Sequence, residues 1–418
     1  MSTLETIVVV GAGHAGVQAA ASLREEGFAG QIELVSGEHA LPYQRPPLSK
    51  KFMTEQMAPS DLLLRGEQFY ADKDIGLRLG DKVLEIDRAD KSVQLASGAR
   101  LAYDHLILAT GSKPRSTDLV GAELDGVQRL CDVDDAIRLR QALRRVGNVV
   151  IVGAGFIGLE IAATATAMGT AVHVVELANR PMARVVSEPV SSFFANMHCA
   201  AGVQLSLGVS VAQIIGSEGR VKQIQLSDGR QLPADIVILG IGAQARDELG
   251  SAAGLACGNG IEVNEMMTTS DPSISAIGDC ALHQNSFAGN RPFRLESIQN
   301  AVDQGRVVAR KLVNKPARYD TVPWFWSDQA HCKLQIAGLA VDCDRVIIRG
   351  DQSADDFAVY SFQGERLRCV ETVNRSGEHM AARRLIGANV SVTPEQVAAS
   401  DFDPREKARQ VANPAAAA

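Results

Sequence analysis

Apolar residues form the same pattern twice, once at the start of the chain and once near its middle. Residues 6–10 are a short apolar run, which is followed by a glycine-rich turn at 11–16 and an alanine-rich segment. Residues 149–152 lead in the same way into a glycine-rich turn at 153–158 and a further apolar segment. Each pattern predicts a strand, a tight turn and a helix, which together open a parallel βαβ unit. The repetition predicts two doubly wound α/β domains.

Alternating apolar and polar positions follow each unit, at 82–95 and at 221–232, and they predict small antiparallel sheets. Each of these stretches ends near an apolar strand, at 106–109 and at 236–239. This order indicates that the second α/β domain interrupts the first. From residue 321 the composition changes to an aromatic cluster and further strand-like runs, which predict a third, α+β domain.

The predicted limits are residues 1–113 and 246–320 for the first, discontinuous domain, 114–245 for the second and 321–418 for the third. A length of 418 residues agrees with two or three domains. Hydrophobic residues make up 46% of the chain and charged residues 22%, which is typical of an ordinary globular protein. The net charge of −7 provides no broad basic field, so we expect no nucleic-acid partner.

One apolar stretch, residues 149–175, has the composition of a membrane span. It contains Glu160 and several glycines, so a buried strand, turn and helix explain it better, and we expect no membrane association. Residues 1–5 lack the basic start and apolar core of a signal peptide, which predicts a cytoplasmic protein. The seven cysteines include no C-x-x-C or other close pair, so we expect reduced thiols and no metal site.

Both glycine-rich turns have the spacing G-x-G-x-x-G. Six glycines carry it: Gly11, Gly13, Gly16, Gly153, Gly155 and Gly158. The first glycine of each set permits the tight turn, the second lets the backbone approach a pyrophosphate, and the third lets the helix pack on the strand. The helix that follows supplies free N–H groups and a partial positive charge. The two turns predict two dinucleotide sites, the alternative being one site and a decayed copy.

Two dinucleotides in one chain indicate a reaction between them. The natural pair is a flavin and a nicotinamide, because hydride moves from nicotinamide C4 to flavin N5 when the two rings stack. The protein then needs mainly to position the rings.

The ribose contacts of the two dinucleotides are predicted at strand ends. Glu176 ends the strand after the second turn, 23 residues beyond Gly153 (176 − 153 = 23). Its carboxylate can hold both hydroxyls of an adenosine ribose and repels a 2′-phosphate, which favours NADH over NADPH. The alternative is a solvated glutamate at a strand end. In the first unit the corresponding carboxylate is displaced, and Glu38 is the candidate.

Four further segments, at 42–50, 109–111, 277–281 and 323–329, occur in order with the two turns. In this combination the chain resembles the putidaredoxin-reductase-like ferredoxin reductases of bacterial oxygenase systems, over nearly its whole length. The resemblance implies a glutathione-reductase-like fold, FAD held by the first unit and NADH held by the second. It also implies a [2Fe-2S] ferredoxin as electron acceptor.

The resemblance assigns roles to individual residues. Lys50 and Glu160 are expected to approach each other beside the flavin, with the ammonium near N5 stabilising the reduced isoalloxazine, although Lys50 as a surface charge is the alternative. Asp279 is expected to accept hydrogen bonds from the ribityl chain, or else to cap a helix. Ile298 and Trp326 are expected near the isoalloxazine, although Trp326 fits an aromatic core position as well.

Further cofactor contacts are implied around both dinucleotides. On the FAD side they are His14, Ala15, Arg45, Val83, Ala109, Thr110, Gly111, Gly278 and Ser297. On the NAD side they are Phe156, Ile157 and Gly242. Hydride transfer needs no histidine, so we expect no acid–base role for His14.

Three segments depart from the family pattern. Residues 130–132 read Leu-Cys-Asp where the family tends to have arginine, which removes one expected polar contact to FAD. Residues 243–246 read Ala-Gln-Ala-Arg where the family usually has proline and asparagine. The segment from His331 to Cys343 is unusual, and the sequence indicates no function for it.

No dithiol follows the first glycine turn, which excludes the relay that disulfide reductases use. We therefore expect NADH to deliver a hydride to FAD and the flavin to pass single electrons, twice, to an acidic ferredoxin. One alternative is an NADH oxidase or a quinone-type reductase. The other is an NADH-sensing flavoprotein that acts by binding partners.

An acidic ferredoxin requires local positive charge on its reductase. The candidates are two groups, Arg306, Arg310 and Lys311, whose spacing predicts one helical face, and Arg383 and Arg384. The alternative is ordinary solvated helix charge. We expect a monomer or a weak dimer.

Overall fold

The computed structural model describes residues 4–412, which divide into two compact units. Unit 1 comprises the chain up to Gln44, residues 59–113 and residues 243–323. Unit 2 comprises residues 45–58, residues 114–242 and the chain from Trp324 onward. The second and third predicted domains thus fall in one unit, together with the short segment 45–58.

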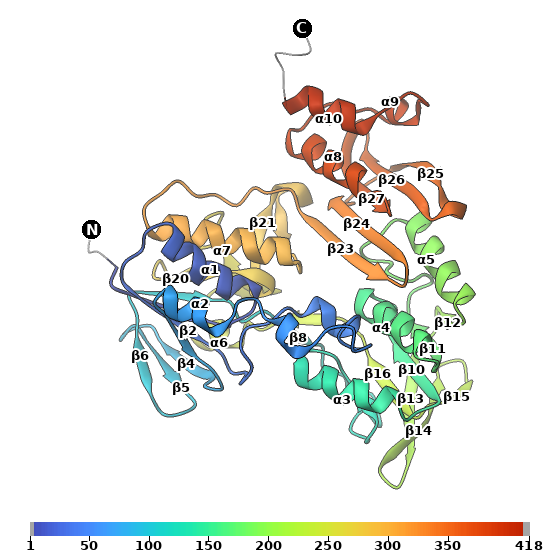
Figure 1. Cartoon of the computed structure of the whole chain (residues 1–418), viewed down its shortest axis with the longest axis horizontal. Helices are drawn as coiled ribbons and strands as arrows, with labels where there is room; N and C mark the ends of the chain where they lie inside the picture. The colour runs from blue at the N-terminus through green and yellow to red at the C-terminus, as the bar shows by residue number, and fades with distance from the viewer. Residues whose placement is uncertain (1–3, 413–418) are drawn as a thin grey trace. The chain divides into compact units, whose positions relative to one another are not determined.

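Unit 1 is built on a five-stranded parallel sheet. The strand order is β20 (Ile274–Ala276), β7 (His105–Leu108), β1 (Thr6–Val10), β2 (Gln31–Val35) and β3 (Ile75–Arg78). Helices α1 (His14–Glu25) and α7 (Ile298–Leu312) pack against each other, as Figure 1 shows. The central strands β1 and β7 are almost wholly apolar and buried, as expected of parallel strands covered on both faces.

Smaller elements complete unit 1. An antiparallel sheet contains β4 (Val83–Asp87), β5 (Ser92–Leu95) and β6 (Arg100–Ala102). A second small sheet contains β18 (Cys257–Gly258), β19 (Gly260–Val263), β21 (Ala281–Asn285) and β22 (Arg291–Phe293). The short helices are α2 (Glu67–Asp72) and α6 (Glu248–Ala252). Strands β8 (Ser112–Pro114) and β17 (Ala243–Ala245) lie where the chain leaves unit 1 and re-enters it.

Unit 2 contains the second parallel sheet. Its order is β12 (Gln204–Leu207), β11 (Ala171–Glu176), β10 (Asn148–Val152), β16 (Ile236–Leu239) and β9 (Val127–Gln128). Its helices are α3 (Val133–Leu143), α4 (Phe156–Ala167) and α5 (Glu188–Ala200). Strands β13 (Val211–Ser217), β14 (Arg220–Leu226) and β15 (Gln231–Pro233) form the antiparallel sheet predicted between β12 and β16.

The C-terminal part of unit 2 is an antiparallel sheet with helices. The strand order is β23 (Trp324–Gln329), β24 (Cys332–Gly338), β27 (Arg366–Val373), β26 (Asp356–Gln363) and β25 (Arg345–Asp351). On one face Phe357 packs edge-on against Phe193 of α5, with ring centroids 4.9 Å apart. On the other face the Tyr360 hydroxyl donates to Glu378 of α8 (Ser376–Gly387) at 2.6 Å. Helices α9 (Pro394–Ala398) and α10 (Pro404–Ala412) follow α8 (Figure 1).

The observed elements confirm the predicted fold class, two doubly wound dinucleotide-binding folds and a C-terminal α+β part. The apolar stretch 149–175 forms β10, a turn, α4 and β11, as predicted. None of the helices formed by residues 4–412 combines the length and the apolar character that a membrane crossing requires. All seven cysteines lie in the described part of the chain, and none forms a disulfide.

Candidate functional site

The first glycine turn joins β1 to α1 in unit 1. Gly11 has φ +108°, and a Cβ there would lie 2.2 Å from the carbonyl oxygen of Ala109. A Cβ on Gly16 would lie 1.9 Å from the carbonyl oxygen of Gly11. A Cβ on Gly13, in contrast, would meet none of the described atoms within 4 Å. Packing therefore requires Gly11 and Gly16, whereas Gly13 leaves open space beside the turn.

The second glycine turn, between β10 and α4 in unit 2, repeats this geometry. Gly153 has φ +105°, and a Cβ there would lie 2.4 Å from the carbonyl oxygen of Gly240. A Cβ on Gly158 would lie 2.2 Å from the carbonyl oxygen of Gly153. Gly155 again faces open space in the described structure. The second turn therefore has the same glycine geometry as the first and is not a decayed copy of it.

The open glycines are also the N-caps of the two helices. Gly13 precedes α1 and Gly155 precedes α4, and neither helix has a capping side chain or an acidic residue in its first turn among the described residues. The first backbone N–H groups of these helices thus have no intrahelical acceptor and carry partial positive charge. Open space beside such N–H groups fits the pyrophosphate of a dinucleotide.

The first turns of the helices carry four predicted contact residues. Ala15 of α1 is buried, and the adjacent His14 begins the helix. The ring of Phe156 in α4 packs against Phe325, with centroids 4.6 Å apart. Ile157 is 53% exposed, so its side chain is accessible to a ligand.

Glu176 ends β11, and its carboxylate lies beside the second glycine turn. Oε2 accepts a hydrogen bond from the Ala154 N–H at 2.7 Å, and Oε1 accepts one from the Ala178 N–H at 2.9 Å. Each oxygen retains capacity for another donor, so the group can also accept from ribose hydroxyls. The next residue, Leu177, is 73% exposed and offers an apolar surface beside the carboxylate.

Glu38 lies three residues beyond the end of β2 in unit 1. Its Oε2 accepts a hydrogen bond from the Tyr43 hydroxyl at 2.6 Å. Its backbone N–H donates to the Ser36 hydroxyl at 3.1 Å. The carboxylate is therefore held in place, although it does not directly end the strand as Glu176 does.

The predicted contacts at 109–111 follow β7. The Thr110 hydroxyl donates to the carbonyl of Arg246 at 2.6 Å, and the Arg246 N–H donates to the carbonyl of Gly111 at 2.9 Å. Arg246, which departs from the family pattern, thus closes this loop through its backbone. Ala109 is buried against Gly11.

Gly278 and Asp279 lie in a 3₁₀ turn, η3 (Gly278–Cys280). The alternative of Asp279 as a helix N-cap is wrong, because the residue lies within η3, whose N-cap position is Ile277. Its carboxylate accepts from the Ser112 hydroxyl at 3.0 Å. The Gly278 N–H donates to Oε1 of Gln304 at 2.7 Å, while the buried Nε2 of Gln304 has no hydrogen-bond partner among the described residues.

The remaining FAD-side candidates of unit 1 differ in what they offer a ligand. Ser297 is the N-cap of α7, and its hydroxyl accepts from the Asn300 N–H at 3.1 Å. Ile298 is the first, partly buried residue of that helix. Val83 is 2% exposed and belongs to the core of unit 1, so its side chain packs internally and only its backbone is available.

Lys50 and Glu160 meet in unit 2. The Lys50 Nζ lies 2.9 Å from Oε1 of Glu160, which is 6% exposed. The hydroxyls of Ser49 and Ser327 donate to its two oxygens, each at 2.6 Å. Burial raises the pKa of Glu160, and the Lys50 ammonium and the two hydroxyls oppose this rise because they stabilise the carboxylate. The alternative of Lys50 as a plain surface charge is wrong, since its side chain is only 17% exposed and is paired.

A hydrogen-bonded chain extends from Glu160 into the C-terminal sheet. Gln329 donates from Nε2 to the Ser327 hydroxyl at 3.2 Å, and its Oε1 lies 2.8 Å from Nε2 of His198. Burial lowers the pKa of His198, so a neutral ring with its proton on Nε2 can donate to that oxygen. Every donor in the chain then points toward the carboxylate, which aligns and strengthens the bonds.

The sequence did not single out Ser49, Ser327, Gln329 or His198. Ser327 and Gln329 occupy alternate positions of β23, and both are buried polar residues. In the sequence, two polar residues at alternate positions of an aromatic, strand-like segment were the only signal that could have pointed to them. His198 carried none, because its helix α5 lies far away in the sequence.

Arg45, Gly242 and Trp326 also fall in unit 2. Arg45 donates to the carbonyl of Cys131, so the departure at 130–132 retains a polar backbone contact. Gly242 has φ +96°, and a Cβ there would lie 3.4 Å from Nη2 of Arg184. Trp326 is partly buried, with its ring centroid 5.5 Å from that of Trp324.

The predicted docking charges are only partly on one face. Arg306 is exposed and pairs with Asp303 at 3.3 Å. The side chain of Arg310 donates to the carbonyl of Pro316 at 3.1 Å. Lys311 does not share their exposed face: its ammonium donates to Thr268 at 2.6 Å, and burial lowers its pKa to about 8.

The second group of charges lies on α8 in unit 2. Arg383 stacks over the ring of Trp324, with Cζ 4.6 Å from the centroid. Arg384 is exposed. The stacked guanidinium can still present charge to solvent along its edge.

Two dinucleotide folds, each with an open glycine turn, define an oxidoreductase that joins a flavin to a nicotinamide. Residues 5–305 match the pyridine nucleotide-disulphide oxidoreductase family, and residues 324–408 match the family described as reductase C-terminal. The chain belongs to the pyridine nucleotide-disulphide oxidoreductase family.

Its relatives are similar over nearly their whole length. The chain is 43% identical to rhodocoxin reductase from Rhodococcus erythropolis over 399 residues, covering 95% of this chain and 93% of the relative. Among solved structures it is similar to the ferredoxin reductase for the CYP199A2 system from Rhodopseudomonas palustris, with a TM-score of 0.94, 44% identity and coverage of 97% and 100%. It is equally similar in fold to the reductase in the covalent putidaredoxin reductase–putidaredoxin complex, with a TM-score of 0.94, 37% identity and full coverage of both chains.

FAD and NAD are the cofactors of this family and of this chain, in agreement with the prediction. The residues present fit both groups. Each unit has one open glycine at the uncapped start of a helix, and each has a carboxylate fixed near the end of the next strand. The enzyme is therefore a flavoprotein oxidoreductase.

Proposed function

We propose that this enzyme transfers electrons from NADH through FAD to a [2Fe-2S] ferredoxin, which supplies an oxygenase of the cytochrome P450 or ring-hydroxylating type. The observation that carries the proposal is the pair of open glycine turns in a chain whose seven cysteines are all free. Two dinucleotides without a dithiol leave the flavin as the exit point for electrons. The acceptor is supported by relatives whose names and titles refer to rhodocoxin reductase, ferredoxin reductase and putidaredoxin reductase.

The roles of the residues follow from what each can bind or hold. FAD and NADH, when bound, supply the hydride and electron chemistry. In the proposal the N–H groups after Gly13 and Gly155 hold the two pyrophosphates, and Glu176 accepts from the ribose of NADH. Lys50 supplies the positive charge that the resemblance places at the flavin, and Glu160 holds its ammonium.

Anaerobic stopped-flow mixing tests the function directly. The enzyme is reduced with NADH and then mixed with a [2Fe-2S] ferredoxin, whose visible absorbance is expected to bleach as it takes electrons. Oxygen or quinone consumption at the same rate without ferredoxin would replace the proposal with an NADH oxidase or a quinone-type reductase. Slow turnover with a long-lived charge-transfer complex would replace it with an NADH-sensing flavoprotein.

Removing the Glu176 carboxylate is expected to weaken discrimination between the two nicotinamides. In Glu176→Ala the KM for NADH should rise about tenfold, because hydrogen bonds to a charged group are lost, while NADPH should change little or improve. Steady-state kinetics with both donors measure this. Glu38→Ala is the matched control, and it should affect FAD retention while leaving the NADH to NADPH ratio intact. An unchanged ratio in Glu176→Ala would mean that the ribose is recognised elsewhere.

Charge reversal on α7 is expected to weaken ferredoxin use. Arg306→Glu should raise the KM for ferredoxin several-fold and reduce its salt dependence, because one attractive charge becomes repulsive. Ferricyanide reduction, which needs no protein docking, should stay the same. Arg318→Glu is the control, since Arg318 is also exposed on unit 1 but lies outside the helix. Equal effects of both variants on ferredoxin kinetics would remove α7 from the docking surface.

The proposal places the enzyme in the cytoplasm, as a monomer or a weak dimer. Seven free cysteines agree with a reducing compartment. Size-exclusion chromatography with light scattering over a range of concentrations tests the oligomeric state, and fractionation of cells tests the location.

A further inference from the structure

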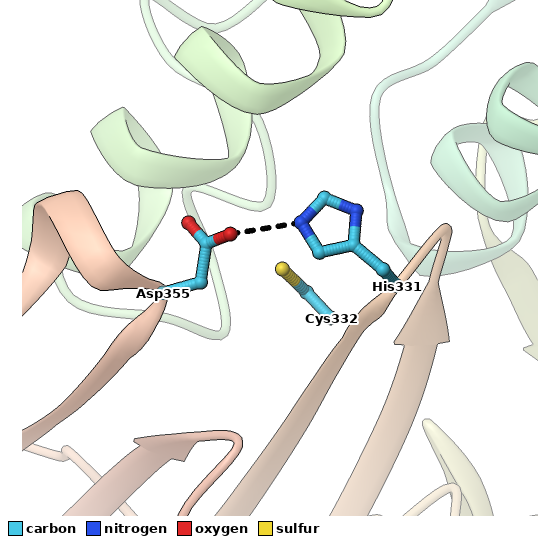
Figure 2. A group of neighbouring side chains, drawn as sticks. All are labelled: His331, Cys332 and Asp355. Atoms are coloured by element: carbon cyan, nitrogen blue, oxygen red, sulfur yellow. Dashed lines mark hydrogen bonds and ion pairs between the residues drawn. The ribbon is translucent and has the colours of Figure 1, made fainter.

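Three potential metal ligands converge at one end of the C-terminal sheet in unit 2. His331 lies in the turn between β23 and β24, Cys332 is the first residue of β24, and Asp355 lies just before β26. The imidazole nitrogen, the thiol sulfur and a carboxylate oxygen all lie within 4.8 Å of one another. Figure 2 shows the three side chains directed toward a common point, with Nε2 of His331 2.8 Å from Oδ2 of Asp355. We propose that these residues form a binding site for one zinc ion.

Hydrogen bonds from the Asn374 side chain to the backbone hold the segments that carry the ligands. Asn374 accepts from the Lys333 N–H through Oδ1 at 2.8 Å and donates from Nδ2 to the carbonyl of Asp355 at 2.9 Å. One side chain thus links the segment that follows Cys332 to the segment that presents Asp355. Asp355 itself has φ +55°, a left-handed conformation that aspartate and asparagine adopt more readily than most residues. Ligands fixed by such supports lose little conformational freedom when a metal binds.

The donor set selects the class of metal. Thiolate, imidazole and carboxylate together suit Zn²⁺, whereas Ca²⁺ and Mg²⁺ require oxygen ligands. Three protein ligands leave the fourth tetrahedral position to water. Cys332 is 1% exposed, while the side chains of His331 and Asp355 are 64% and 37% exposed, so the site is closed on the thiol side and accessible on the other.

Two other interpretations of the cluster explain less. A surface ion pair between His331 and Asp355 would not require a thiol beside it. A redox-active cysteine would need an accessible thiol, but Cys332 is only 1% exposed. The sequence set the segment from His331 apart but did not indicate a metal site, because Asp355 lies 23 residues beyond Cys332 (355 − 332 = 23).

Zinc titration of the FAD-loaded enzyme, in competition with a chromophoric chelator, tests the proposal. One equivalent is expected to bind, and His331→Gln and Asp355→Asn should each weaken binding about tenfold or more. Asp355→Asn keeps both the left-handed backbone and the carbonyl that Asn374 uses, so it should fold normally. Cys199→Ser is the control, because Cys199 is an exposed thiol outside the cluster and its loss should leave the affinity unchanged.

X-ray absorption at the zinc edge identifies the ligands without interference from the flavin. One sulfur at about 2.3 Å and nitrogen or oxygen ligands at about 2.0 Å are expected, with the sulfur lost in Cys332→Ala. A zinc shell without sulfur, an affinity equal in all variants, or no stoichiometric binding would overturn the proposal. Flavin reduction by NADH should be unchanged in His331→Gln and Asp355→Asn. A failure of the zinc proposal can therefore be distinguished from a failure of the proposed electron-transfer function.

Discussion

Gly13→Ala is expected to give a folded protein that has lost most of its FAD. The added Cβ meets none of the described atoms within 4 Å, and φ at this position is −78°, which alanine adopts without strain. Its cost to the fold should therefore be about 1 kcal/mol or less, the usual difference at an N-cap. The same methyl group occupies the space through which a pyrophosphate must approach. We expect FAD affinity to fall at least about tenfold, measured by the flavin to protein ratio and by titration with added FAD.

The two glycine turns provide the controls for this prediction. Gly155→Ala should retain FAD and instead weaken NADH binding, because its Cβ occupies the equivalent space in unit 2. Gly11→Ala should misfold, since its Cβ would lie 2.2 Å from the Ala109 carbonyl oxygen at φ +108°. Circular dichroism separates these outcomes. A Gly13→Ala protein with full, normally retained FAD would remove the first turn from the flavin site.

Glu160→Ala is expected to destabilise the protein and to slow its reduction by NADH. Without the carboxylate, the Lys50 ammonium and the hydroxyls of Ser49 and Ser327 lose their common partner in a buried site. Removing one partner of a buried ion pair costs about 3–5 kcal/mol, and the lower end applies because Lys50 keeps some exposure. In the proposed function the misplaced ammonium should also slow flavin reduction by about tenfold to a hundredfold. Thermal unfolding and stopped-flow reduction measure the two effects.

A double variant separates stability from catalysis at this pair. Lys50→Met with Glu160→Leu replaces the ions by apolar side chains of similar size, which is often neutral for stability. It should recover only part of the unfolding free energy, because the buried hydroxyls of Ser49 and Ser327 still lack their acceptor, and it should not recover the reduction rate. Glu160→Gln should lie between, since the amide oxygen can still accept from one serine. Reduction by NADH at the normal rate in the double variant would show that the pair has only a structural role.

Much of the fold could be predicted because its signals are local. The apolar runs at 6–10 and 149–152 and the glycine spacings that follow them lie within about twenty residues each, and both units form as expected. The same locality explains Glu176, which the strand after the second turn brings back to Ala154. The docking prediction for Lys311 failed for the opposite reason. Helical spacing places it near Arg310, but the partner that draws its ammonium inward, Thr268, is 43 residues away.

The sequence by itself predicted the two dinucleotide folds, the missing dithiol and the position of Glu176 at the end of the strand after the second turn, because each depends on residue type and short spacing. Only the tertiary structure showed that Glu160 collects donors from η1 (Pro46–Ser49) and from β23, and that His198 lies at the end of the chain of donors. It alone joined His331 and Cys332 to Asp355. Such clusters depend on where separate strands and helices pack. The sequence does not show which distant group will form a hydrogen bond with a given polar side chain once both are buried.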